Sequence, residues 1–396
     1  MPNSTPATPA APSGSAVRGM TPIHPFRPLF FGAAAFASLG MILWGLFLYL
    51  GWLPMSALPA PLWHGHAMLF GFASALIGGF LLTAAANWTR MATTTPASLA
   101  TLFTLWLAAR IVFMTTLPLA LAAALELAYL LGLALLVGRV IVRAGNRRNF
   151  FVIGLLLSYA ALDAAFLFGA AYGTALASHA LVWTVDWLTL LMLVIGGRVI
   201  PFFTGRRLSN LQVTDRKPLM LAINLGALLA LLIDIAGAPA SVRGALWLLL
   251  GVLALLRLAG WRGWGTLHEP MLWSLHLGYL WLAIGMALRG ATLLGLWVQL
   301  PGLHNSLHGI TIGALGTLSL AMMTRVAQGH SGVAIRANRW LVAAFLLPSG
   351  AALLRLSGGP ELWPAAASLW VLAYLIYLGT VGPLLLRGHV LSAPDA

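Results

Sequence analysis

The chain alternates long apolar runs with short stretches of Pro, Gly, Asn and basic residues. An α-helix rises about 1.5 Å per residue, so a run of about 20 apolar residues crosses the ~30 Å hydrocarbon layer of a membrane. The pattern predicts twelve such helices, and the pair at 97–115 and 117–142 has almost no loop between its members. The predicted ranges are 29–50, 62–86, 97–115, 117–142, 150–170, 175–200, 218–235, 242–259, 270–288, 304–323, 339–356 and 362–386.

Composition supports this pattern. Of the 396 residues 60% are hydrophobic and only 8% are charged, which excludes an ordinary soluble protein and predicts an all-α, polytopic membrane protein. We expect one transmembrane domain at 24–390, a disordered cytoplasmic tail at 1–23 and a short cytoplasmic tail at 391–396. The first tail lacks the apolar core of a signal peptide.

Basic residues predict the orientation. When the 22 Lys and Arg residues are assigned to alternate sides of the twelve helices, three fall on one side: Arg243, Arg289 and Arg355. Arg110 lies inside a predicted helix, and the remaining eighteen fall on the other side. Because cytoplasmic loops are rich in Lys and Arg, this asymmetry places both termini and the loop at 198–217 in the cytoplasm. The basic residues are spread over many loops, which argues against a nucleic-acid partner.

Two pairs of histidines lie near the opposite, outer face. His64 and His66 begin one predicted helix, and His304 and His308 begin another, with His179 at a similar depth. His304 and His308 project from one helix face, whereas His64 and His66 are about 200° apart on a regular helix. Since the chain has no cysteine, a metal needs His, Met or oxygen ligands. Imidazoles suit haem iron and copper, and also zinc. The alternative is that these histidines are separately hydrogen-bonded residues at the membrane surface.

A second group of histidines lies toward the cytoplasm. His24 precedes the first predicted helix, and His276 lies within the ninth. Either residue is a candidate axial ligand or an ordinary interfacial residue.

Ionisable side chains inside predicted helices are functional candidates, because a charge in the membrane is costly. The carboxylates are Glu126, Asp163 and Asp186, and the cation is Arg110. One interpretation is a proton route from Asp186 through Asp163 or Glu126. The other is a pair between Arg110 and a carboxylate that fixes helix packing.

Several motifs carry a family resemblance. HPFRPLFF from His24, WHGHAMLFGF from Trp63, GGRVIPFFT from Gly196 and HGITIGALGTLSLAMMTRVAQGHSG from His308 resemble the NnrS family. The resemblance implies a twelve-helix inner-membrane protein of bacteria that carries haem and copper and is linked to the handling of nitric oxide. One position departs from the family, which usually has Glu after the second His of its WHxHEM motif. This chain has Ala67 there.

The histidine pattern together with what the resemblance implies predicts an inner-membrane protein with b-type haem and copper that binds nitric oxide. We expect it to reduce nitric oxide to nitrous oxide with electrons from membrane quinol. Candidate metal ligands are His64, His66, His179, His304 and His308. His66 and His308 are favoured for haem because they lie deeper than His64 and His304, and His24 and His276 are further haem candidates. The alternatives are a twelve-helix transporter for a small molecule or metal, and a non-catalytic protein that protects against nitrosative stress.

Overall fold

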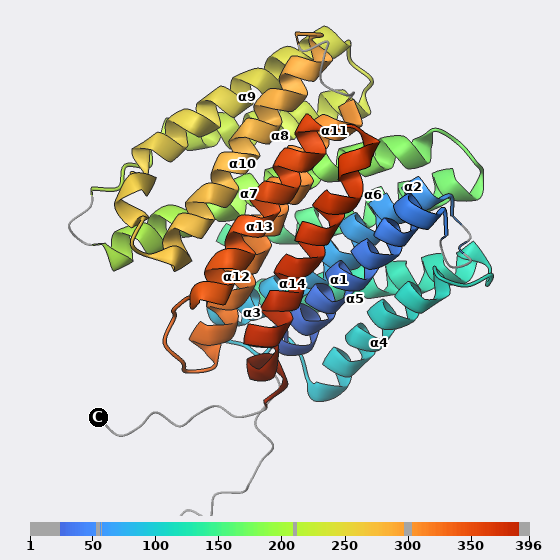
Figure 1. The fold of residues 1–396 in the computed structure, drawn as a ribbon. Coiled ribbons are helices and arrows are strands. Elements are labelled where there is room, and N and C mark those ends of the chain that lie inside the picture. Colours follow the sequence, from blue (N-terminus) through green and yellow to red (C-terminus); the bar gives the residue numbers. More distant parts are fainter. Residues whose placement is uncertain (1–23, 53–55, 57, 209–211, 297–302, 388–396) are drawn as a thin grey trace, which may run out of the picture.

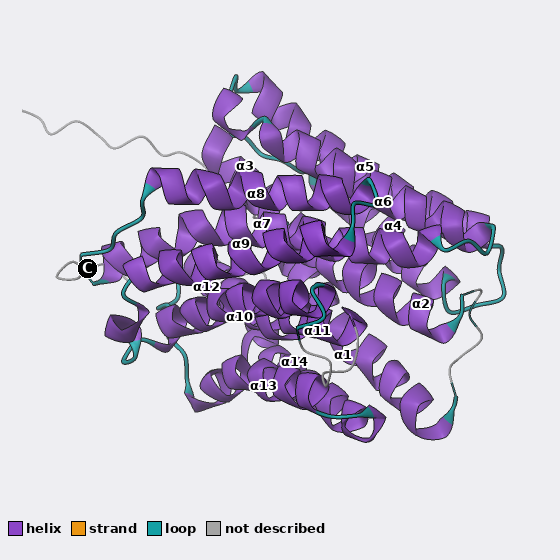
Figure 2. Ribbon diagram, turned by 90° about the horizontal axis from the view of Figure 1, so that it is seen from above, coloured by secondary structure: helices purple, strands orange, loops and turns teal. Residues whose placement is uncertain are grey.

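The computed structural model describes residues 24–52, 56, 58–208, 212–296 and 303–387. The predicted tails at 1–23 and 391–396 lie outside the described residues. The described part of the chain contains helices and connecting segments but no strand (Figures 1 and 2). The all-α fold predicted from the sequence is therefore confirmed.

The helices follow the apolar runs. The structure contains the following elements, of which η1 and η4 are π-helical and η2, η3 and η5 are 3₁₀ turns: α1 (Phe26–Leu50), α2 (Ala60–His66), η1 (Ala67–Phe72), α3 (Ala73–Thr89), α4 (Pro96–Val112), α5 (Leu119–Arg143), η2 (Arg147–Asn149), α6 (Phe151–Ala171), α7 (Leu176–Arg207), α8 (Lys217–Ile235), α9 (Ala240–Gly260), η3 (Gly263–Thr266), α10 (Pro270–Leu293), α11 (Leu303–His308), η4 (Gly309–Ala314), α12 (Leu315–His330), α13 (Arg339–Ser357), η5 (Pro360–Leu362) and α14 (Trp363–Leu386).

Eleven helical spans in the described part of the chain are long and apolar enough to cross a membrane, and α4 is a shorter apolar helix of 17 residues. The chain is thus a multi-pass membrane protein. Helix α4 begins at a capping box, in which Thr95 and Ser98 each accept a hydrogen bond from the other's backbone N–H. This cap marks the start of α4, and Pro118 marks the start of the next helix, α5.

Several helix ends differ from the prediction, and two of them change the position of charged residues. The helix expected to end at Ile200 continues through Pro201 to Arg207, so half of the predicted loop at 198–217 is helical. The helix expected to end at Leu288 continues to Leu293 and includes Arg289, which is fully buried. Arg289 was expected on the outer surface, but buried carboxylates stabilise its charge inside the bundle.

The spans differ in burial. About 78% of the most hydrophobic window of Ala60–Thr89 is buried, compared with 28% for Lys217–Ile235. The span Ala60–Thr89, together with α7, α10 and the span Asn305–His330, forms the centre of the bundle. The C-terminal helix α14 packs against α1 and α13, which brings the two ends of the described chain side by side (Figure 1).

Both histidine-bearing spans contain a π-helical segment. η1 begins directly after His66, and η4 begins directly after His308. A π-segment loosens the regular hydrogen bonding of the helix, and its backbone carbonyls need other donors in a membrane. Near η1, Trp106 Nε1 donates to the carbonyl of Gly71 over 2.9 Å, and the Tyr159 hydroxyl donates to that of Leu69.

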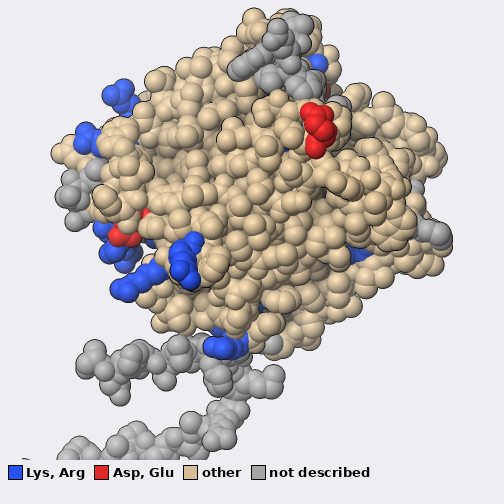
Figure 3. Space-filling view, viewed as in Figure 1, with Lys and Arg blue, Asp and Glu red and all other residues tan. Residues whose placement is uncertain are grey.

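In Figure 3 the Lys and Arg side chains lie mainly toward the left and lower left, one acidic patch lies toward the upper right, and residues of other types cover most of the surface between them. Such an uncharged band is what a lipid-facing surface requires.

Candidate functional site

A cavity of about 490 Å³ lies at the end of the bundle where the two histidine-bearing spans begin. His64 and His308 both line it, although they come from opposite halves of the chain. Most of the other lining side chains are apolar or aromatic, and the polar exceptions include Ser178, Thr311 and Arg355. A mostly apolar cavity with a few polar groups is typical of a cofactor site.

The ring of His64 is held by stacking. It lies on the indole of Trp44, with 4.4 Å between ring centroids and 13° between the planes. Its Nδ1 atom is buried and has no hydrogen-bond partner among the described residues. The ring of His64 thus lines the cavity while its Nδ1 atom lacks a partner among these residues.

His66 lies away from this cavity wall. Its Nε2 atom is 3.0 Å from Oδ1 of Asp163, and both side chains are almost completely buried. Phe70, Phe113 and Phe166 surround the ring, with centroid distances of 5.2, 4.5 and 4.7 Å. The carboxylate that meets His66 thus comes from α6, whereas position 67, at which the family usually has Glu, is the buried Ala67.

Arg110 and Glu126 form a buried ion pair between α4 and α5. The Arg110 guanidinium also lies 5.6 Å from the ring centroid of Phe113, which packs on His66. This pair is the packing arrangement that the sequence left open as the alternative to a proton route.

Asp186 belongs to a different group of charges. Arg289 Nη2 donates to Asp186 Oδ2 over 3.0 Å and to Asp234 Oδ2 over 2.9 Å. Arg243 Nη1 donates to the other oxygen of Asp234 over 2.6 Å. Asp234 was not among the candidates from the sequence, because this residue lies one position from the end of its predicted helix. Arg243 and Arg289 were both expected on the outer surface. The structure therefore places Asp186 with these residues and Asp163 with His66.

The other candidate outer histidines lie elsewhere. His179 is exposed and packs beside Trp183, at 5.9 Å between centroids. His304 belongs to α11, but its side chain lies outside the described residues. Among the described residues, no three His, Cys, Asp or Glu side chains come together as a metal-ligand group.

His24 and His276 lie at the opposite end of the bundle. His24 packs beside His330, with 6.1 Å between ring centroids. Burial and the nearby Arg27 guanidinium lower the pKa of His24, so its ring is neutral at pH 7. His276 is buried, and its Nε2 atom is 3.0 Å from Oγ1 of Thr204. The structure does not bring either residue to the cavity lined by His64 and His308.

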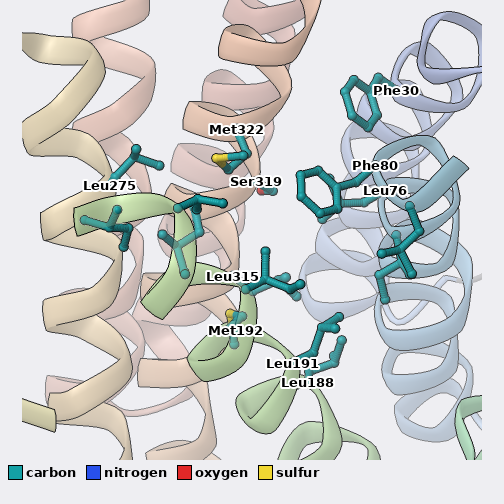
Figure 4. Close-up of a pocket in the computed structure, with 17 residues that line it drawn as sticks. Phe30, Leu76, Phe80, Leu188, Leu191, Met192, Leu275, Leu315, Ser319 and Met322 are labelled. Atoms are coloured by element: carbon teal, nitrogen blue, oxygen red, sulfur yellow. The ribbon is translucent and has the colours of Figure 1, made fainter. Parts of the chain in front are cut away.

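A second, almost wholly apolar cavity of about 100 Å³ adjoins the first. Leu315, on α12, lines both cavities. Figure 4 shows Leu315 together with Phe80, Leu188 and Met322 around the smaller space. Apolar side chains thus surround the inner side of the histidine-lined cavity, which limits the access of water from that direction.

The chain was compared with curated proteins and with models of protein families. No curated protein matches the chain significantly. The model of the family described as NnrS protein matches residues 23–388, which include both π-interrupted spans and every residue that lines the two cavities. The resemblance drawn from the motifs is therefore confirmed, and the chain belongs to the NnrS family.

Proposed function

We propose that this protein is a haem protein of the bacterial inner membrane that binds nitric oxide in the cavity lined by His64 and His308. We further propose that it reduces nitric oxide to nitrous oxide with electrons from membrane quinol. The observation that carries the proposal is the meeting of these two histidines in one cavity. Membership of the NnrS family supports it, because that resemblance implies haem, copper and nitric oxide.

The cavity fits a haem group. Ligand cavities measure roughly 300–1,000 Å³, and this one measures about 490 Å³. The buried Nδ1 atom of His64 has no partner among the described residues, and a neutral imidazole nitrogen is a usual haem ligand. The absence of cysteine favours b-type haem, which is held without covalent attachment.

His64 and His308 are the residues that would hold the haem. His64 is preferred to His66 because it lines the cavity, whereas His66 is bonded to Asp163. Bound there, the haem would supply the site for nitric oxide and the path for electrons. Trp44 fixes the ring plane of His64, and the apolar walls keep water away.

Reduction of two nitric oxide molecules to nitrous oxide and water consumes two protons and two electrons. His66 and Asp163 are suited to hold a proton, which would lie between Nε2 and Oδ1. His66 lies two residues along the chain from His64, which lines the cavity. Glu126 and Asp186 are each paired with an arginine, which favours a packing role for those two carboxylates.

Copper also belongs to the proposal, but only through the family resemblance. The predicted metal ligands include His304 and also His179, which is exposed, and we assign no step to copper.

The test begins with the full chain, produced in haem-replete cells and purified in detergent. We expect a Soret band, one that His64→Ala and His308→Ala each eliminate or shift. His268→Ala is the matched control, because His268 is exposed at the other end of the bundle, and it should keep the wild-type spectrum. Anaerobic addition of nitric oxide and reduced quinol should yield nitrous oxide. A colourless wild-type protein, or wild-type spectra in both cavity variants, would overturn the haem site.

A further inference from the structure

Arg355 is a cation in the wall of the histidine-lined cavity. It lies near the end of α13 and lines the same space as His64 and His308. Two contacts fix its side chain. Nη1 donates to Oδ1 of Asn305, and the guanidinium carbon lies 3.9 Å from the ring centroid of Trp363. The cation therefore has a defined place beside the two histidines.

The charge of Arg355 has no protein counter-ion in the described part of the chain. No carboxylate there lies within ion-pair distance of it, and its one hydrogen-bond acceptor, Asn305, is neutral. Arg355 is half-buried. Three buried arginines of the bundle are each paired with an acid, Arg110 with Glu126, Arg257 with Asp215 and Arg289 with Asp186, whereas the buried Arg27 donates to backbone carbonyls and to Ser331. A half-buried cation without a counter-ion has lost part of its hydration, and a bound anion offsets that loss.

We propose that Arg355 binds a carboxylate of the cavity's occupant, which, on the haem function proposed above, is a propionate group of haem. The guanidinium presents parallel N–H donors that match the two oxygens of a carboxylate. The rest of the wall, including Met41, Phe72 and Trp370, is suited to the apolar faces of the porphyrin. The edge of the haem that carries the propionates would therefore face Trp363 and Asn305.

The test measures how fast haem leaves the protein in lipid nanodiscs, by its transfer to a soluble apo-globin in excess. Removing a charge-assisted hydrogen bond should speed release of native haem about 10- to 100-fold in Arg355→Leu. Arg355→Lys should fall between Arg355→Leu and the wild type. The matched control is Arg339→Gln, which removes an exposed arginine of the same helix that also lies over an indole, that of Trp340.

Haem dimethyl ester provides a second arm of the test, in which the ligand is changed. Its propionates carry no charge, so the wild-type protein should release it about 10- to 100-fold faster than native haem. Arg355→Leu should release the two haems at similar rates. Equal release of native haem by wild type and Arg355→Leu, or equal release of both haems by the wild type, would overturn the role of Arg355 alone. If the wild type takes up neither haem, the proposed function fails, and this inference fails with it.

Discussion

The Nε2 atom of His66 lies 3.0 Å from Oδ1 of Asp163, inside a cage of three phenylalanine rings. His64, two residues earlier, lines the cavity instead. Residues two apart on a helix point in directions about 200° apart. One histidine of this motif thus lines the cavity, and the other is engaged with an acid.

We expect Asp163→Asn to keep its haem and to lose nitric oxide reduction. The amide can still accept a hydrogen bond from His66 but cannot take up the proton, and loss of general acid–base catalysis typically costs about 10²- to 10⁴-fold in rate. The measurement is nitrous oxide formation per haem. Glu269→Gln is the control, because Glu269 forms an exposed pair with Arg207. Wild-type turnover in Asp163→Asn would remove this pair from the proton route.

Glu126→Gln should destabilise the protein, because it leaves the buried Arg110 without its counter-ion. Breaking a buried ion pair costs about 3–5 kcal/mol, whereas replacing both partners by apolar residues is often close to neutral. Thermal unfolding of Glu126→Gln and of the double variant Arg110→Leu/Glu126→Leu should therefore give a lower Tm only for the former. If instead Glu126→Gln keeps its Tm and loses turnover, Glu126 returns to the proton route.

Arg289→Met should be more damaging than Asp186→Asn. The first variant leaves Asp186 without a cation, whereas the second leaves Arg289 still bonded to Asp234 over 2.9 Å. We expect the yield of folded protein and the Tm to be lowest for Arg289→Met, higher for Asp186→Asn and highest for the wild type. The free energy of unfolding should fall by about 3–5 kcal/mol in Arg289→Met. Nitric oxide turnover per haem should be unchanged in Asp186→Asn. Full stability combined with loss of turnover would contradict the packing role.

The orientation can be tested with reporter fusions. The excess of Lys and Arg on one side predicts that Gly205 faces the cytoplasm and Leu58 the periplasm. A phosphatase reporter should be active only at Leu58, and a fluorescent or cytoplasmic enzyme reporter only at Gly205. Phosphatase activity at Gly205 would reverse the topology and move the histidine-lined cavity to the cytoplasmic side.

The sequence predicted the helices well, because each helix must carry a nearly continuous apolar run. It predicted helix ends less well. Arg289 looked like a terminal charge, and only its contact with Asp186 and Asp234, from two other helices, shows why the helix continues past it.

The site was partly predictable. The pairing of two distant histidine motifs was visible, but depth along the helix favoured His66 over His64. In the structure His64 lines the cavity and His66 does not, because the two side chains point in different directions. The π-segments that begin after His66 and His308 leave no clear mark in the sequence. Trp44 and Arg355 complete the cavity wall through long-range packing, which no local pattern predicts.

Helix α4 has a consequence for the lipids around the protein. Its 17 residues span only about 25 Å at 1.5 Å per residue, less than the ~30 Å hydrocarbon layer. Its neighbour α5 has 25 residues, so the two present lipid with different lengths. Where the bilayer adapts to α4 by thinning, it thins by about 5 Å, at a fraction of a kilocalorie per ångström. Lipids with shorter acyl chains should therefore collect along this edge of the bundle.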